Sequence, residues 1–76
     1  MKTFTKEDGA KIRATGIKMA KKRNPVYLIK QNEPFEVVTN EGLLRGHDGG
    51  YVAHDPISGH VWPISADYVS QHYEDF

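Results

Sequence analysis

The stretch that decides the fold is GGYVAHDPISGHVWPISADYVSQHY, residues 49–73. Two short strand-like runs, Tyr51 to His54 and His60 to Ile64, flank a turn that contains Pro56 and Gly59. This arrangement predicts a β-hairpin. Ser65 then has the side chain of a helix N-cap, so a short closing helix is expected. Its apolar face would hold Tyr68, Val69, His72 and Tyr73.

Three further strands are predicted upstream, at Val26–Lys30, Phe35–Thr39 and Leu43–Arg45. Turn-forming residues separate them, with Asn and Pro before residue 35 and Asn-Glu-Gly at 40–42. Five short strands with frequent turns predict a strongly bent five-stranded antiparallel sheet, a small barrel like that of Src-homology-3 domains. With a helix before it and a helix after it, the expected class is α+β.

The N-terminal part predicts a helix over roughly residues 5–22. Thr5 is a plausible N-cap, acids follow at positions 7 and 8, and apolar residues then recur at helical spacing. Asn24-Pro25 should end the helix, because the residue before proline avoids helical geometry. We therefore expect a single domain over 1–76, with a basic helical segment at 1–24 and a β-rich core with its closing helix at 25–76.

Composition limits the class of protein. The chain has 76 residues and no cysteine, which allows one small core and no disulfide. No apolar run approaches the roughly 18 residues of a membrane span, and the N-terminus has no apolar secretory region. We expect a soluble intracellular protein that makes no membrane contact.

The net charge of zero hides an asymmetry between the two ends of the chain. Residues 1–30 hold nine basic residues against two acidic ones, a net charge of +7, and residues 31–76 hold one against eight, a net charge of −7. Such a two-ended chain favours an interaction function. The alternative is that the two ends offset each other within the fold, since exposed ion pairs are common and individually weak.

The basic segment is the leading candidate for a partner-binding site. It carries six cations: Lys11, Arg13, Lys18, Lys21, Lys22 and Arg23. A helix with these residues could dock a protein, or neutralise phosphates in a nucleic acid. It could also be a solvated face with no partner.

Aromatic residues are candidates for the core or for stacking on a ligand. Trp62, Phe35 and Tyr68 are expected in the core, because a chain of this size needs large apolar side chains to form one. Phe4 and Phe76, near the two termini, are expected to be exposed or to anchor a partner.

Nothing in the sequence predicts an active site, a small-molecule substrate or a cofactor. His54 and His60 flank the hairpin turn and could face each other across it, but their spacing matches no zinc signature. We expect two exposed hairpin histidines and no metal. His47-Asp48 and His54-Asp55 are chain neighbours, and neighbours on a strand point to opposite faces, which does not favour acid–base catalysis.

Several stretches of the chain match the pattern of a known family. They are Lys22-Arg23-Asn24-Pro25-Val26, Glu41-Gly42, Asp48-Gly49-Gly50-Tyr51-Val52, Gly59-His60-Val61-Trp62-Pro63-Ile64 and Tyr68 to Glu74. In these stretches the sequence resembles small phage-encoded proteins of unknown function. The resemblance covers residues about 22 to 74, and the N-terminal basic helix is not part of it. The sequence departs from the family pattern at Gly50, where Asp is usual, and at His60, where Glu is usual.

The resemblance implies a phage or prophage origin and expression in the cytoplasm of a bacterial host. Together with the opposite charges of the two ends, it favours an accessory protein that binds, and inhibits, a host protein such as a polymerase, nuclease or defence complex. Two alternatives remain. One is a nucleic-acid-binding module that uses the basic helix, and the other is a structural or assembly protein that self-associates through its opposite charges.

Overall fold

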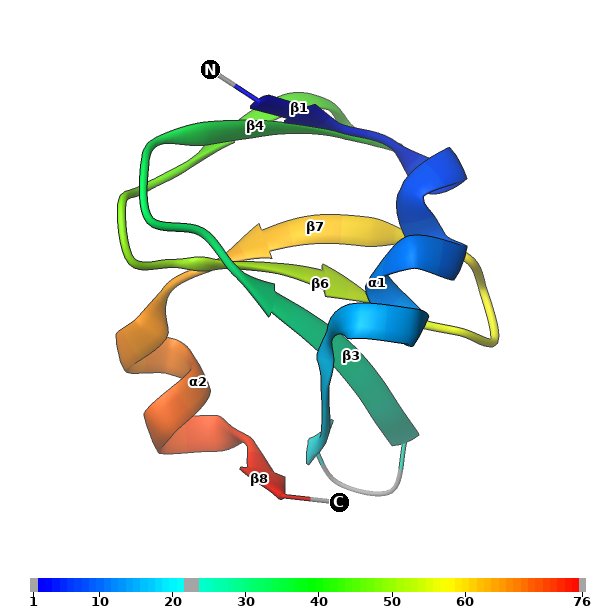
Figure 1. Ribbon diagram of the computed structural model, residues 1–76, viewed down its shortest axis with the longest axis vertical. Helices are drawn as coiled ribbons and strands as arrows, with labels where there is room; N and C mark the ends of the chain where they lie inside the picture. The colour runs from blue at the N-terminus through cyan, green and yellow to red at the C-terminus, as the bar shows by residue number, and fades with distance from the viewer. Residues whose placement is uncertain (1, 22–23, 76) are drawn as a thin grey trace.

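The computed structural model describes residues 2–21 and 24–75, which form two β-sheets, two short α-helices and a single 3-10 turn (Figure 1). The elements follow the chain as β1 (Lys2–Phe4), η1 (Lys6–Asp8), α1 (Gly9–Thr15), β2 (Ile17–Lys21), β3 (Asn24–Lys30), β4 (Phe35–Thr39), β5 (Gly42–Gly46), β6 (Tyr51–His54), β7 (Val61–Ile64), α2 (Ala66–His72) and β8 (Glu74–Asp75).

The smaller sheet has the strand order β1-β4-β5. β1 runs parallel to β4, while β4 and β5 form an antiparallel hairpin. The hairpin turns at Asn40 and Glu41, and Gly42 follows with a φ of 111°, a left-handed value that glycine adopts at little cost. The hydroxyl of Thr39 donates a hydrogen bond of 2.9 Å to the carbonyl of Gly42, which fixes the turn.

The larger sheet has the order β7-β6-β3-β2-β8, and every neighbouring pair in it is antiparallel. Gln31 extends the pairing of β3 with β6, because its backbone N–H donates to Gly50 and its carbonyl accepts from Gly49, each over 2.9 Å. Residues 32–34 then carry the chain across to β4 in the smaller sheet. The two sheets face each other in Figure 1.

The expectation of one bent five-stranded sheet like a Src-homology-3 barrel is therefore wrong, although helices and strands are mixed as expected. The five expected strands all form, but the Phe35–Thr39 and Gly42–Gly46 hairpin belongs to a separate sheet. The other difference comes from three strands that the sequence did not predict. These are β1, β2 and β8. β1 pairs with β4, which is distant in the sequence. β2 pairs with β3, which follows it in the chain, and with β8, which is distant.

The predicted helix over 5–22 is also wrong beyond Thr15. Thr5 does cap the first turn, and its backbone N–H donates to the Asp8 carboxylate over 2.8 Å. At Gly16, however, the backbone becomes extended. A Cβ atom there would lie 2.6 Å from the carbonyl oxygen of Leu28, so only glycine allows so close an approach to β3. Residues 17–21 then pair with β3 along their whole length, because tertiary pairing overrides a weak helical preference.

Two small cores lie on opposite faces of the larger sheet, because side chains of a strand alternate between its faces. The core between the two sheets is formed by Phe4, Ile12, Phe35, Val37, Val52 and Val61. The core under α2 is formed by Val26, Leu28, Ala53 and Val69, with Trp62 and other half-buried residues packed against it. Phe35 is fully buried as predicted, and Trp62 is half-buried.

The closing helix forms as expected. The side chain of Ser65 accepts a hydrogen bond from the backbone N–H of Tyr68 over 3.1 Å, and the helix runs over Ala66–His72. Its inner face is narrower than predicted, because Val69 is buried while Tyr68 is 37% exposed. The placement of Tyr68 in the core is therefore wrong, and its ring is on the surface.

Candidate functional site

The basic residues do not form one helical stripe. Lys11 and Arg13 lie in α1, whereas Lys18 and Lys21 lie in β2, on the far side of the extended Gly16. The Nζ atom of Lys18 lies 6.0 Å from the centre of the Tyr27 ring. Lys22, Arg23 and Phe76 lie outside the described residues, as does the side chain of Lys21.

Arg13 contacts a buried histidine. Its Nη1 atom lies 2.7 Å from Nε2 of His54. Arginine has only donors, so the imidazole must accept this bond and is neutral, with its proton on Nδ1. Burial, followed by the nearby Arg13 charge, lowers the pKa of His54 below its ordinary value of 6.5. Arg13 is itself exposed, so its predicted role in binding a partner stays a prediction.

Phe4 was expected to be exposed or to anchor a partner, and the expected exposure is wrong. Only 8% of Phe4 is accessible, because β1 pairs with β4 and places the ring in the core between the sheets. The ring contacts Phe35 edge to face, with a centroid distance of 6.1 Å. The terminal position of Phe4 in the chain gave no sign of this pairing.

The two hairpin histidines do not face each other. His54 pairs with Val61 and is 1% exposed, so its expected place on the surface is wrong. His60 is exposed as expected, and its Nε2 atom lies 2.8 Å from the side-chain amide nitrogen of Asn40. Among the described residues, no group of three His, Cys or acidic side chains is close enough to hold a metal ion.

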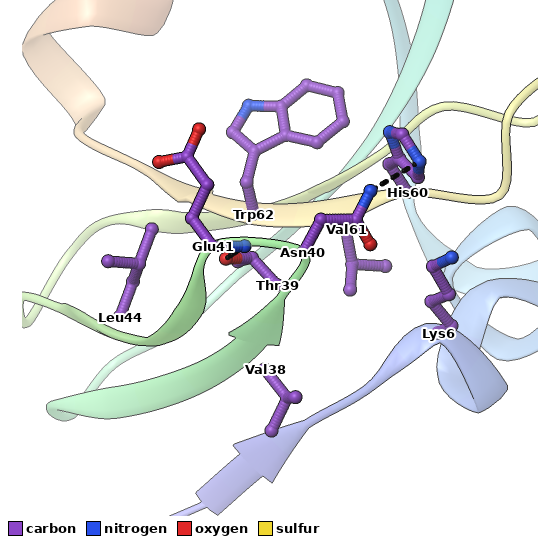
Figure 2. Close-up of a pocket in the computed structure, with 9 residues that line it drawn as sticks. All are labelled: Lys6, Val38, Thr39, Asn40, Glu41, Leu44, His60, Val61 and Trp62. Carbon is purple, nitrogen blue, oxygen red and sulfur yellow. Dashed lines mark hydrogen bonds between the residues drawn. The ribbon is translucent and has the colours of Figure 1, made fainter.

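A groove lies where the tip of the β4–β5 hairpin meets β7, and we call it the hairpin groove (Figure 2). It has a volume of about 290 Å³. Apolar side chains from three strands line it, among them Val38 of β4, Leu44 of β5 and Val61 of β7. Polar groups sit at its rim, where Asn40 and His60 are joined by their hydrogen bond.

The charges at the rim of the hairpin groove are separated. In Figure 2 the Glu41 carboxylate rises on the same side as the indole of Trp62, while Lys6 lies at the opposite end of the groove. The Trp62 end is therefore acidic and the Lys6 end is basic. A ligand that spans the groove would meet both signs of charge.

A second hollow, the aromatic groove, lies between β7 and α2 and has a volume of about 480 Å³. It is lined by Trp62, Pro63, Ile64, Ser65, Tyr68 and Tyr73. The Tyr68 and Tyr73 ring centroids are 6.1 Å apart, with the ring planes inclined at 57°. The rings therefore form an angled wall and not a parallel stack.

Trp62 is common to both grooves, because it lines the hairpin groove and the aromatic groove. Several large apolar residues along these two grooves are exposed: Val38 at 43%, Leu44 at 40% and Tyr68 at 37%. Apolar residues gathered beside concave surfaces are typical of binding sites. Aromatic rings, apolar side chains and a few hydrogen-bonding groups suit non-covalent binding.

The sequence alone indicates part of the exposed apolar surface along the two grooves. Val38 and Leu43 pair across the hairpin on one face, while Val37 and Leu44 pair on the other. Apolar residues on both faces of a hairpin in so small a chain imply that some remain exposed. The role of Trp62 had no such signal, because it depends on how β7 packs against α2 and the hairpin.

Comparison of the chain with models of protein families, with curated proteins and with solved structures found no match. The resemblance to small phage-encoded proteins therefore stays a prediction. No helix within residues 2–21 and 24–75 is long and apolar enough to cross a membrane.

Proposed function

We propose that this protein acts by binding a host protein through the surface around Trp62, as a small accessory protein of phage type. The observation that supports the proposal is that Trp62 lines two adjoining grooves whose apolar side chains are exposed. Tryptophan and tyrosine are the side chains that most often dominate protein interfaces. Binding would inhibit the partner by covering a surface that it uses.

The charge pattern favours a protein over a nucleic acid as the partner. Glu41 stands beside Trp62 in the hairpin groove. Carboxylates repel the phosphates that dominate nucleic-acid binding. The nucleic-acid alternative depended on one basic helix over 5–22, and that helix ends at Thr15.

Site-specific crosslinking tests the proposal. A photoreactive amino acid placed at Leu44, which is 40% exposed inside the hairpin groove, should crosslink one dominant protein in a lysate of the bacterial host. The same amino acid at Ile57 is the matched control, because this residue is 78% exposed in the β6–β7 turn and lines neither groove. Identical crosslinking patterns from the two positions would contradict the proposal.

A further inference from the structure

The aromatic groove has a lining that selects one kind of ligand. Three rings, those of Trp62, Tyr68 and Tyr73, surround it together with Pro63. Indole and phenol rings have few rotatable bonds, so they present large contact areas at a low cost in conformational entropy. Tyr68 and Tyr73, inclined at 57°, line a hollow in the surface, and this trough fits a ridge better than it fits a flat surface.

The geometry points to an extended, proline-containing segment of the partner, with a cationic side chain beside the prolines, as the occupant of this groove. This inference rests on the proposed function and names the part of the partner that is bound. Proline segments adopt the polyproline II conformation, which has three residues per turn and no internal hydrogen bonds. Their pyrrolidine rings form a ridge that packs on aromatic rings, and little chain entropy is lost because the conformation is preformed.

Charge complementarity supplies the cationic part of the ligand. The Glu41 carboxylate lies on the Trp62 side of the hairpin groove, where the two grooves meet. Lys6, the basic residue of the hairpin groove, lies at the other end, away from Trp62. A lysine or arginine beside the prolines would therefore meet the Glu41 carboxylate.

Fluorescence of the native protein tests the inference directly, because Trp62 is the only tryptophan of the chain. The probe is an oligoproline peptide that ends in arginine. We expect a saturable change in Trp62 emission. The same peptide ending in glutamate should bind about two- to fivefold more weakly, the range for an exposed charge pair. A glycine-serine peptide ending in arginine should cause no saturable change.

Two variants locate the binding. Tyr68→Ala removes one ring of the trough from an exposed position. The affinity for the oligoproline peptide should fall by about tenfold or more, as expected for an aromatic residue at the centre of an interface. Ile57→Ala removes a side chain that is 78% exposed and lines neither groove, so the affinity should stay the same. Equal affinity of both variants would place the peptide elsewhere and overturn the inference.

The inference and the proposed function fail in different ways. If the oligoproline peptide leaves Trp62 emission unchanged while position 44 still crosslinks a host protein, the inference is overturned and the proposed function stands. If a single-stranded oligonucleotide quenches Trp62 and the peptide does not, the occupant is a nucleic acid and the inference is again overturned. If the peptide binds but no host protein crosslinks, only the inference is supported.

Discussion

The guanidinium group of Arg13 donates a hydrogen bond to the imidazole of His54 over 2.7 Å, from α1 to the last residue of β6. The imidazole is 1% exposed, so this hydrogen bond joins an exposed arginine to a buried ring. Through it the Arg13 side chain links α1 to β6.

The first prediction concerns the pH dependence of stability. The pKa of His54 is lowered in the folded protein by burial and by Arg13, whereas in the unfolded chain it is about 6.5. Below pH 6.5 His54 therefore binds a proton more readily in the unfolded state than in the folded state, and stability falls as the pH decreases. The decline, at most about 1.4 kcal/mol per pH unit for one proton, ends below the folded pKa.

Chemical denaturation measured between pH 8 and pH 5 would show this decline, and NMR of the imidazole protons would report the titration of His54 itself. Arg13→Gln should raise the pKa of His54, because it removes the positive charge beside the ring. Lys11→Gln is the matched control, since it removes an exposed cation from the same helix. A His54 ring that titrates at or above pH 6.5 in the native protein would contradict the prediction.

Asp55 gives a separate effect at lower pH. The backbone N–H of Ile57 donates to its carboxylate over 2.9 Å, and this bond is the main cause of its lowered pKa. Its stabilising contribution is present above pH 3.8 and is lost as the pH falls through the folded pKa. Asp55→Asn should therefore weaken the dependence of stability on pH below 3.8. Because the Asp55 charge raises the pKa of His54, the variant should also lower that pKa further, which keeps or deepens the decline near pH 6. Denaturation curves of the variant and the native protein at both pH values would check this.

Gly9→Ala should destabilise the protein, although alanine favours helices over glycine. A Cβ atom at position 9 would lie 2.7 Å from Cε1 of the buried His54 ring, so the ring or the helix has to move. Overpacking of this kind costs about 1–3 kcal/mol, which exceeds the helix-propensity gain of up to about 1 kcal/mol. Thermal unfolding would measure the difference. A more stable Gly9→Ala variant would show that the contact between α1 and β6 is looser than described.

Phe4→Ala should cost about 3–5 kcal/mol, because its ring lies in the core between the two sheets. A loss of this size could abolish folding in so small a domain. Thr3→Ala is the control, since Thr3 is the exposed neighbour in the same strand and should change stability by less than about 0.5 kcal/mol. Equal denaturation midpoints for the two variants would mean that β1 does not pack as described.

Gly46→Ala should be more damaging than Gly42→Ala. Gly46 pairs with Phe35, and a Cβ atom there would overlap the Phe35 ring. Gly42 has open space around it, so substitution there meets only the strain of its positive φ, about 1 kcal/mol for a single left-handed residue. Urea denaturation would rank the two variants. The reverse order would contradict the packing of Phe35 against β5.

Local chemistry was enough to predict much of the secondary structure. The Tyr51–His54 and Phe35–Thr39 strands and the N-caps at Thr5 and Ser65 form as expected. Each depends on interactions within a few residues: alternation of side chains, a turn with glycine at positive φ, or a hydroxyl that accepts from a nearby N–H. The exposed His60 and the buried Phe35 also followed from composition and position.

Tertiary structure decided what remained. The segment Ile17–Lys21 is a strand because its backbone pairs with β3 on one side and with β8 on the other. Phe4 is buried because β1 pairs with β4. His54 was expected to be exposed at the end of a strand beside the hairpin turn, and only the approach of α1 with Gly9 and Arg13 placed it in the interior. The surface around Trp62 likewise depends on three elements meeting. Local sequence sets each residue's preferences, but contacts between distant segments determine which face each strand buries.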